Sequence, residues 1–235
     1  MSLSIIPIAG IPEVHVGDEL ADQVAGAALA QGTPLADWDC VVVTQKVVSK
    51  AENRLVVLDP SDPDARARLI ESESVRIVRR RGELVISETR HGFVCANAGI
   101  DLSNVPEGLA ALLPLDADRS AQHIRDAFRA RHGVEVAVIV SDTFGRAWRL
   151  GLTDVAIGVA GIAAVVDLRG TTDAEGRELQ VTEVAIADEI AGAAELVMGK
   201  AEGIAAAIVR GLDPAWAADG RAQHLVRPAA EDLFR

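Results

Sequence analysis

The most informative segment of the sequence is VEVAVIVSDTFGRAWR, residues 134–149. Its β-branched, nearly continuous apolar run is typical of a buried strand. The polar end of the segment carries Asp142, Thr143, Arg146 and Arg149. Because binding and catalytic residues often lie on loops that follow strand ends, we expect this strand to end near Asp142 and to deliver these side chains to a site.

The flanking segments predict a mixture of helices and strands. Residues 116–133 have the apolar spacing of an amphipathic helix that stops at Gly133, and residues 75–89 hold two β-branched runs around Arg81-Gly82, which predict a hairpin. The first half of residues 38–51 predicts a buried strand. Further strands are expected within 3–10, 53–59 and 203–211, and helices within 16–32, 60–74 and 176–199. The pattern indicates a mixed α/β or α+β fold.

Composition excludes several classes of protein. The chain has 235 residues, of which 49% are hydrophobic, so it can bury a real core and is not disordered. A formal net charge of −12 argues against nucleic-acid and anionic-membrane partners. Cys40 and Cys95 form no disulfide framework and lie in apolar surroundings. The apolar run 155–166 is too short to span a bilayer, and with no leader visible we expect a cytoplasmic protein.

Lysine is rare in this chain. Lys46, Lys50 and Lys200 are its only lysines, among 23 basic residues. Either they survive by chance in an arginine-biased sequence, or they stand where a guanidinium cannot serve.

A second segment, HGFVCANAGIDLSN at 91–104, places small residues before the polar group Asp101, Ser103 and Asn104. Small residues permit close approach, and a carboxylate beside a hydroxyl and an amide suits an oxygen-liganded metal. The alternative is a loop in which Asp and Asn cap a turn. With Asp142 and Thr143, Asp101 would complete a Mg²⁺ or Mn²⁺ site.

Cations for phosphate groups are also present. Arg146 and Arg149 could hold phosphate or carboxylate oxygens in bidentate fashion, and metal plus arginine is typical of phosphoryl transfer. Lys50 follows the buried strand and could reach a nucleotide phosphate. The alternatives are surface arginines on an Asx-turn and a snorkelling lysine. Neither G-x-x-x-x-G-K-[ST] nor G-x-G-x-x-G occurs in the sequence. The residues alone therefore predict a metal- and phosphate-handling enzyme of unknown substrate.

Long stretches of the chain resemble the coenzyme F420-0:γ-glutamyl ligase family, and most closely the N-terminal half of its actinobacterial two-domain members. The matching stretches follow the family's order across residues 9–212: GIPEVHVGDEL, VVVTQKVVSKAENRL, RHGFVCANAGIDLSN, LLPLDADRSAQHIR, VIVSDTFGRAWRLGLTDVAIGVAGI, TEVAIADEIAGAAELVMGKA and IVRGL. The resemblance implies an α+β fold of mixed and antiparallel sheets with flanking helices, assembled as an intertwined homodimer.

The resemblance also implies the activity. GTP would phosphorylate the terminal carboxylate of F420-0, or of a dehydro form, and L-glutamate would attack the acyl phosphate; further glutamates would follow through γ-linkages. The implied cofactors are Mg²⁺ or Mn²⁺, with K⁺ as a further ion, and the implied metal ligands are Asp101, Asp142 and Thr143. Arg146 and Arg149 are our candidates for the catalytic cations. The implied nucleotide contacts are Ile11, Pro12, Glu13, Val14, Gln45 and Lys50 around the TQK…SK strand, Asn104, Met198, Gly199, Lys200, Ala201, Glu202, Gly203 and Ile204.

Two departures from the family pattern concern the second metal and the tail. Where archaeal members have an acidic residue that helps to hold a second metal, this chain has Lys200, so either Glu202 substitutes or the second ion is held differently or absent. We expect a ligase domain at 1–212, with two lobes as an option, followed by a tail at 213–235. The tail resembles the linker to a flavin-binding nitroreductase-like domain, which favours a truncated two-domain protein over a natural single-domain ligase.

Two other functions stay open from the sequence. One is a non-catalytic nucleotide- or F420-binding module of a two-domain enzyme, and the other is a metal-dependent phosphatase that uses the same aspartates.

Overall fold

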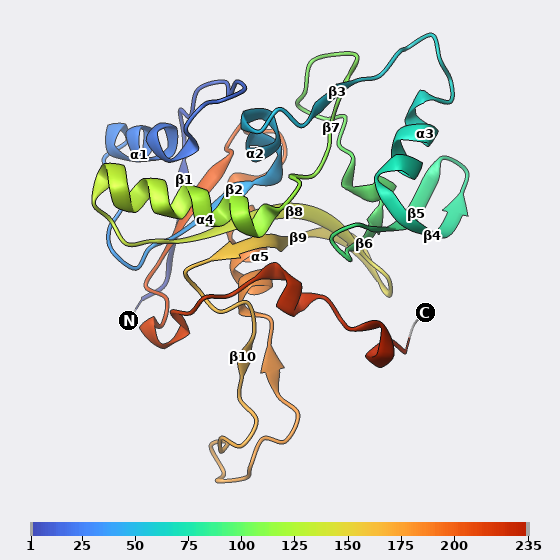
Figure 1. Ribbon diagram of the computed structural model, residues 1–235. Coiled ribbons are helices and arrows are strands. Elements are labelled where there is room, and N and C mark those ends of the chain that lie inside the picture. The colour runs from blue at the N-terminus through green and yellow to red at the C-terminus, as the bar shows by residue number, and fades with distance from the viewer. Residues whose placement is uncertain (1, 234–235) are drawn as a thin grey trace.

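The computed structural model describes residues 2–233, and its centre is a five-stranded mixed sheet in the order β1–β12–β2–β8–β9 (Figure 1). The strands are β1 Ser4–Ile8, β2 Cys40–Thr44, β8 Ala137–Arg146, β9 Arg149–Ala160 and β12 Ala206–Arg210. Only β2 and β8 run parallel; the other neighbours are antiparallel. The expected α+β class is confirmed.

Helices cover both faces of this sheet. Strand β2 alternates its side chains, so Val41 and Val43 pack beneath helices α1 Leu20–Ala30 and α4 Ala117–Ala127. Cys40 and Val42 pack instead on α5 Ile186–Met198 (Figure 1). Because both faces are buried, the strand is apolar throughout, as the sequence indicated. The helix expected at 116–133 is confirmed: Asp116 caps α4, and one further turn leads to Gly133 in a left-handed conformation.

A smaller lobe lies beside the central sheet (Figure 1). Helix α3 Ala65–Ser72 packs there with a three-stranded sheet of β4 Ser74–Arg81, β5 Leu84–Thr89 and β6 Val94–Ala96. The β4–β5 hairpin around Arg81-Gly82 is confirmed. A short ladder of β3 Leu55–Val57 and β7 Leu109–Ala111 connects the lobe to the body.

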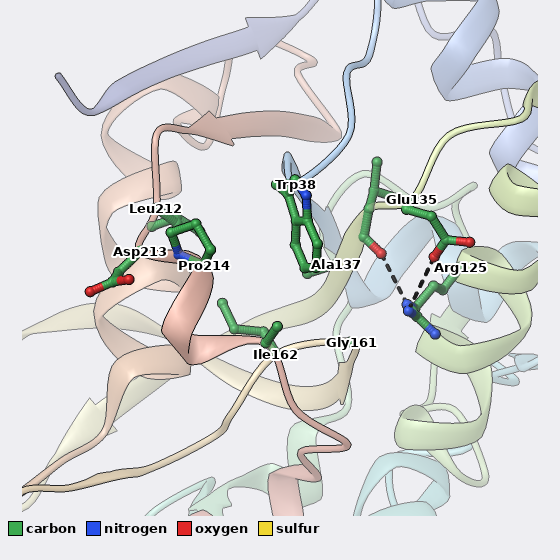
Figure 2. A pocket seen from close by; sticks show the side chains of 11 residues that line it. Trp38, Arg125, Glu135, Ala137, Gly161, Ile162, Leu212, Asp213 and Pro214 are labelled. Atoms are coloured by element: carbon green, nitrogen blue, oxygen red, sulfur yellow. Dashed lines mark hydrogen bonds and ion pairs between the residues drawn. The ribbon is translucent and has the colours of Figure 1, made fainter. Parts of the chain in front are cut away.

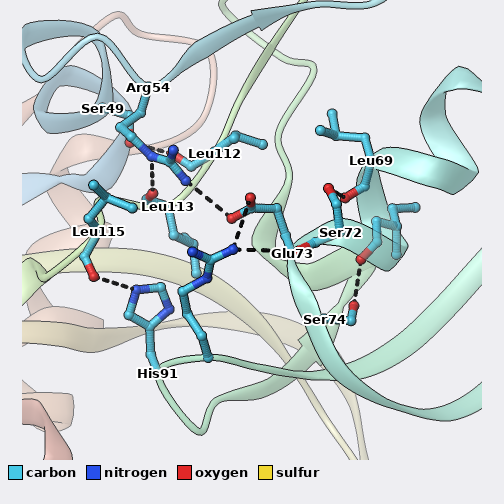
Figure 3. Close-up of polar contacts among 12 residues, drawn as sticks. Ser49, Arg54, Leu69, Ser72, Glu73, Ser74, His91, Leu112, Leu113 and Leu115 are labelled. Atoms are coloured by element: carbon cyan, nitrogen blue, oxygen red, sulfur yellow. Dashed lines mark hydrogen bonds and ion pairs between the residues drawn. The ribbon is translucent and has the colours of Figure 1, made fainter.

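One ion-pair network joins the lobe to the body (Figure 3). Glu73, at the end of α3, accepts from Arg54 at 3.1 Å and from Arg90 at 3.3 Å. The Arg54 Nε also donates to the backbone carbonyl of Leu113 at 3.0 Å, which ties the network to the body. Nearby, Ser49 donates to Leu112 and His91 contacts Leu115, each through a backbone oxygen.

We expect Glu73→Ala to lower the free energy of unfolding by about 1–3 kcal/mol, because it leaves two arginines without their shared, largely buried carboxylate. Urea denaturation followed by circular dichroism measures the change. The control is Glu71→Ala, whose pair with Arg80 is exposed on both sides, so its expected cost is below about 1 kcal/mol. An equal loss of unfolding free energy in the two variants would show that the network does not stabilise the contact between the smaller lobe and the body.

The segment after β9 forms an arm. Strands β10 Val166–Asp167 and β11 Glu183–Val184 pair as a two-stranded ribbon that projects away from the body (Figure 1). Residues 213–233 then run back beneath β9, and Ala222 is buried there. No helix among residues 2–233 combines the length and the hydropathy needed to cross a bilayer.

Side chains from the helices on both faces of the sheet accept hydrogen bonds from backbone amides at the outer edge of β9. The Val159 amide and the Ala222 amide each donate to Asp118 Oδ1 on α4 at 2.8 Å. The Ala156 amide donates to Asp188 Oδ1 on α5 at 2.9 Å.

Candidate active site

The site forms where β8 extends beyond the end of its parallel neighbour β2. Strand β2 ends at Thr44, opposite Ser141, while β8 continues to Arg146 as one arm of a long hairpin with β9. The expectation that the strand ends near Asp142 is therefore wrong, because the pairing of β8 with β9 keeps the chain extended. Beyond Ser141 no described strand pairs with β8 on the β2 side, so this edge of β8 has no neighbouring strand there.

Asp101 lies on the loop after β6, held by a bridge to Ala111. Its carboxylate accepts from the Ser103 amide at 2.7 Å and pairs with Lys46 Nζ at 2.9 Å. Lys46 also donates to the Ser103 hydroxyl at 3.0 Å. The approach is as close as the small residues suggested: a Cβ on Gly99 would lie 2.8 Å from Leu113. The loop therefore delivers a carboxylate and a hydroxyl to one lysine.

A second group lies around Asp154, which is only 2% exposed in the interior of β9. Thr143 stands opposite it in the hairpin register, and the Thr143 hydroxyl donates to Asp154 Oδ1 at 2.6 Å. The Ser141 hydroxyl donates to Asp154 Oδ2 at 3.1 Å. Lys200 Nζ lies 2.8 Å from Asp154 Oδ1 and 2.7 Å from Glu195 Oε1 on α5.

Asp142 lies between these two groups and responds to both. Burial raises its pKa to about 7, and the nearby charges of Asp101 and Asp154 add to the rise. Burial also opposes the charge of Asp101, but hydrogen bonds from Lys46 and the Ser103 amide hold its pKa below the usual value. A buried carboxylate that resists ionisation beside other carboxylates makes an environment that attracts cations.

Asp101 and Asp142 carry carboxylate oxygens, the ligand type that Mg²⁺ and Mn²⁺ prefer. No set of three or more His, Cys, Asp or Glu side chains within residues 2–233 is arranged as a ready metal site. The Thr143 hydroxyl, the third expected ligand, is already engaged by Asp154 and Lys200. The structure thus brings the three expected metal ligands to one region but gives the threonine hydroxyl another partner.

The residues expected to contact the nucleotide lie on the turn at 11–14, on helix α2, on the loop after Asp101 and on the segment 198–204. Gln45 and Lys50 lie on helix α2 Gln45–Ala51 rather than on a strand, because β2 ends at Thr44. Lys50 Nζ contacts Glu13 at 2.5 Å, which brings the turn containing Ile11, Pro12 and Val14 to α2.

Gln45 is buried, its Oε1 accepts from Ser49, and its Nε2 has no partner among the described residues. Asn104, in a left-handed conformation, lies three residues after Asp101 on the same loop.

The segment after α5 runs past this region into β12. The Ala205 carbonyl accepts from the Thr44 amide at 3.0 Å, directly before α2. The expected contacts begin at Met198, the fully buried last residue of α5, and continue through Gly199, Lys200, Ala201, Glu202, Gly203 and Ile204. Lys200 contacts the carboxylates of Asp154 and Glu195 and the hydroxyl of Thr143.

Arg146 and Arg149 are not part of this cluster. They face each other at the tip of the β8–β9 hairpin, and both are exposed. Arg146 Nη2 donates to the Leu150 carbonyl at 2.8 Å, and the Leu150 side chain is 98% exposed. Arg146 lies four positions beyond Asp142 on the extended strand, about 13 Å away.

One hollow in the described part of the chain also lies elsewhere. A cavity of about 100 Å³ is lined by Trp38, Glu135, Ile162 and Pro214 (Figure 2). Arg125 crosses its wall, donating to the Val136 carbonyl at 3.0 Å and to Glu135. This cavity borders the first residue of β8, about 17 Å along the strand from Asp142, so it is separate from the acidic cluster.

Sequence reasoning missed Asp154, Glu195 and the role of Lys46. Asp154 had a signal: a lone carboxylate within an apolar run is costly to bury without a partner. Had residues 137–160 been recognised as one hairpin, Asp154 would have fallen opposite Thr143. The three lysines pair with carboxylates: Lys46 with Asp101, Lys50 with Glu13, and Lys200 with Asp154 and Glu195.

The fold and the site together define an enzyme, with carboxylates and lysines gathered at the open edge of a central strand. The sequence profile of F420-0:Gamma-glutamyl ligase matches residues 9–211. The chain is 44% identical to the coenzyme F420:L-glutamate ligase of Methanothermobacter thermautotrophicus, with 100% of each chain covered. It is 40% identical to the enzyme of the same name from Methanopyrus kandleri, over 100% of this chain and 98% of the relative. The chain belongs to the F420-0:gamma-glutamyl ligase family and is a ligase.

Proposed function

We propose that this chain joins L-glutamate to F420-0, or to its dehydro form, by a GTP-dependent reaction through an acyl phosphate, and then adds further γ-linked glutamates. Family membership supports the ligation. The observation that carries the chemistry is the convergence of Asp101, Asp142 and Lys46 beside helix α2. An acyl-phosphate route needs fixed cations near the phosphates and a carboxylate pair that can hold a divalent ion.

Each group has a distinct part in this reaction. Asp101 and Asp142 would hold Mg²⁺ or Mn²⁺, which supplies positive charge to phosphate oxygens when bound. Lys46, 2.9 Å from Asp101 Oδ2, orients that carboxylate. Lys50 links α2 to the 11–14 turn and offers a second fixed cation. The buried Gln45 Nε2 has no partner among residues 2–233, and an oxygen of a bound ligand would satisfy this donor.

The proposal also includes a further ion, the oligomeric state, the location in the cell and the remaining nucleotide contacts. K⁺ as a further ion, a homodimer, a cytoplasmic location and nucleotide contacts from Asn104 and the 198–204 segment all rest on the resemblance of the sequence to the family. The number of glutamates added is left to measurement.

Mass spectrometry of F420-0 incubated with the chain, L-glutamate, GTP and Mn²⁺ tests the function. We expect mass increments of one glutamate residue or more, and none when GTP or L-glutamate is omitted. GTP turnover that proceeds equally without L-glutamate would identify a phosphatase instead. A folded chain that binds GTP and yields no increment would identify a binding module.

Arg146→Met tests our assignment of a catalytic cation. The side chain is exposed and donates its hydrogen bond to the backbone carbonyl of Leu150, so the melting temperature should move by about 2 °C or less. If Arg146 holds a phosphoryl group or the phosphodiester of the substrate, turnover should fall at least about tenfold. Steady-state kinetics and thermal melting, with Arg149→Met in parallel, measure both. Unchanged turnover would remove Arg146 from the mechanism, and comparable losses of turnover and stability would make it structural.

A further inference from the structure

The ammonium group of Lys200 is surrounded by oxygen atoms from three different elements. Its Nζ lies 2.5 Å from Thr143 Oγ1 on β8, 2.8 Å from Asp154 Oδ1 on β9 and 2.7 Å from Glu195 Oε1 on α5. A lysine ammonium has three donors, so all three find acceptors here. The arrangement resembles a coordination shell of hard oxygens, with the ammonium in the place of the ion.

This position requires a cation. Asp154 is 2% exposed, and an ionised carboxylate at such depth is costly unless it is paired. The hydroxyls of Ser141 and Thr143 share its two oxygens, but only Lys200, among the described residues, brings positive charge to it. Glu195 adds a second carboxylate, whose Oε2 is buried and has no partner within residues 2–233. Glu195 Oε2 is therefore an oxygen that the Lys200 ammonium does not contact and that a metal ion could bind.

We propose that Lys200 is a built-in cation, which fills a second cation position beside Thr143 and leaves the site with one divalent ion fewer than it would otherwise bind. The lysine does not react; it positions Thr143 and Asp154 next to Asp142. It is tethered through the turn after α5, where Gly199 has a φ of 61° that favours glycine. The inference rests on the proposed function only for the ion at Asp101 and Asp142. The number of ions gained when Lys200 is removed is measured separately from that ion.

The test counts Mn²⁺ ions bound to the full chain. Loss of the free Mn²⁺ signal in electron paramagnetic resonance gives the number of ions bound per chain. We expect Lys200→Ala to bind one more Mn²⁺ than the unaltered chain, because the three oxygens and the space become open to metal. Lys200→Ala/Asp154→Asn should lose that extra ion. The control Arg177→Ala removes one positive charge from an exposed position in the arm and should leave the number unchanged.

The outcomes separate this inference from the proposed function. If the unaltered chain binds no Mn²⁺ but Lys200→Ala binds one, the inference about Lys200 is supported. The same result contradicts the proposed metal site at Asp101 and Asp142. If Lys200→Ala binds the same number as the unaltered chain, the lysine does not replace a metal and the inference is overturned. If Lys200→Ala folds only when Mn²⁺ is present, as judged by circular dichroism, the metal has taken the lysine's place, which supports the inference. A variant that is unfolded with and without Mn²⁺ would make Lys200 a structural residue and overturn it.

Discussion

Asp142→Asn should reduce glutamate addition on the order of 1,000-fold and leave the chain folded, with a melting temperature no lower than that of the unaltered chain. The loss of rate follows from removing a charged ligand from the proposed metal site, where a bound ion contributes several kcal/mol to catalysis. Stability should respond in the opposite direction. Burial and the neighbouring carboxylates raise the pKa of Asp142 to about 7, so the ionised group opposes folding and its neutral isostere does not.

Mass spectrometry of the F420 products and thermal melting in metal-free buffer measure the two effects. Asp167→Asn is the matched control, because this aspartate pairs with Arg169 on the exposed arm and should leave the rate unchanged. A large fall in melting temperature for Asp142→Asn would mean that the carboxylate is structural. Undiminished glutamate addition would exclude Asp142 from the metal site.

Gly158→Ala should destabilise the chain by about 3 kcal/mol or more. A Cβ at this position of β9 would lie 2.1 Å from the backbone oxygen of Ala117, in the first turn of α4. Backbone cannot rotate away as a side chain can, so the strand or the helix must shift. The helix packs directly on this strand, and the shift would disturb the larger core cluster.

Gly26→Ala is the control for this substitution. Gly26 lies within α1, and a Cβ there would meet no neighbouring atom within 4 Å, so alanine should raise the free energy of unfolding by about 0.5–1 kcal/mol through helix propensity. Urea denaturation of both variants measures the contrast. A Gly158→Ala variant as stable as the unaltered chain would show that α4 and β9 are not in such close contact.

Local patterns predicted much of the fold. The β4–β5 hairpin followed from two β-branched runs on either side of Arg81-Gly82, and α4 followed from its apolar spacing and the stop at Gly133. Both signals lie within a few residues of the structure that they specify. The strand-to-helix change at Gln45 was harder to predict, because a valine-rich run such as 41–48 fits a buried strand or a buried helix equally well.

The site was predicted only in part, since its geometry depends on pairing between distant segments. Asp101 and Asp142 were singled out for their chemistry, and the structure brings them near each other. Asp154 is recognised as a site residue only from the register of β8 with β9. Glu195 is recognised only from the packing of α5 on that hairpin. Conversely, Arg146 looked close to Asp142 in sequence, but an extended strand carries it away to the hairpin tip.

The two aspartates at the margin of β9 affect how copies of this chain can associate. An outermost strand with free amides is a template on which another chain can add a strand, which is a common route to aggregation. Here Asp118 and Asp188 already accept the amides of Val159 and Ala156. An incoming strand would have to displace both carboxylates and face their negative charge. The margin of the sheet is thereby protected against uncontrolled polymerisation at this place, by two side chains rather than by a covering strand.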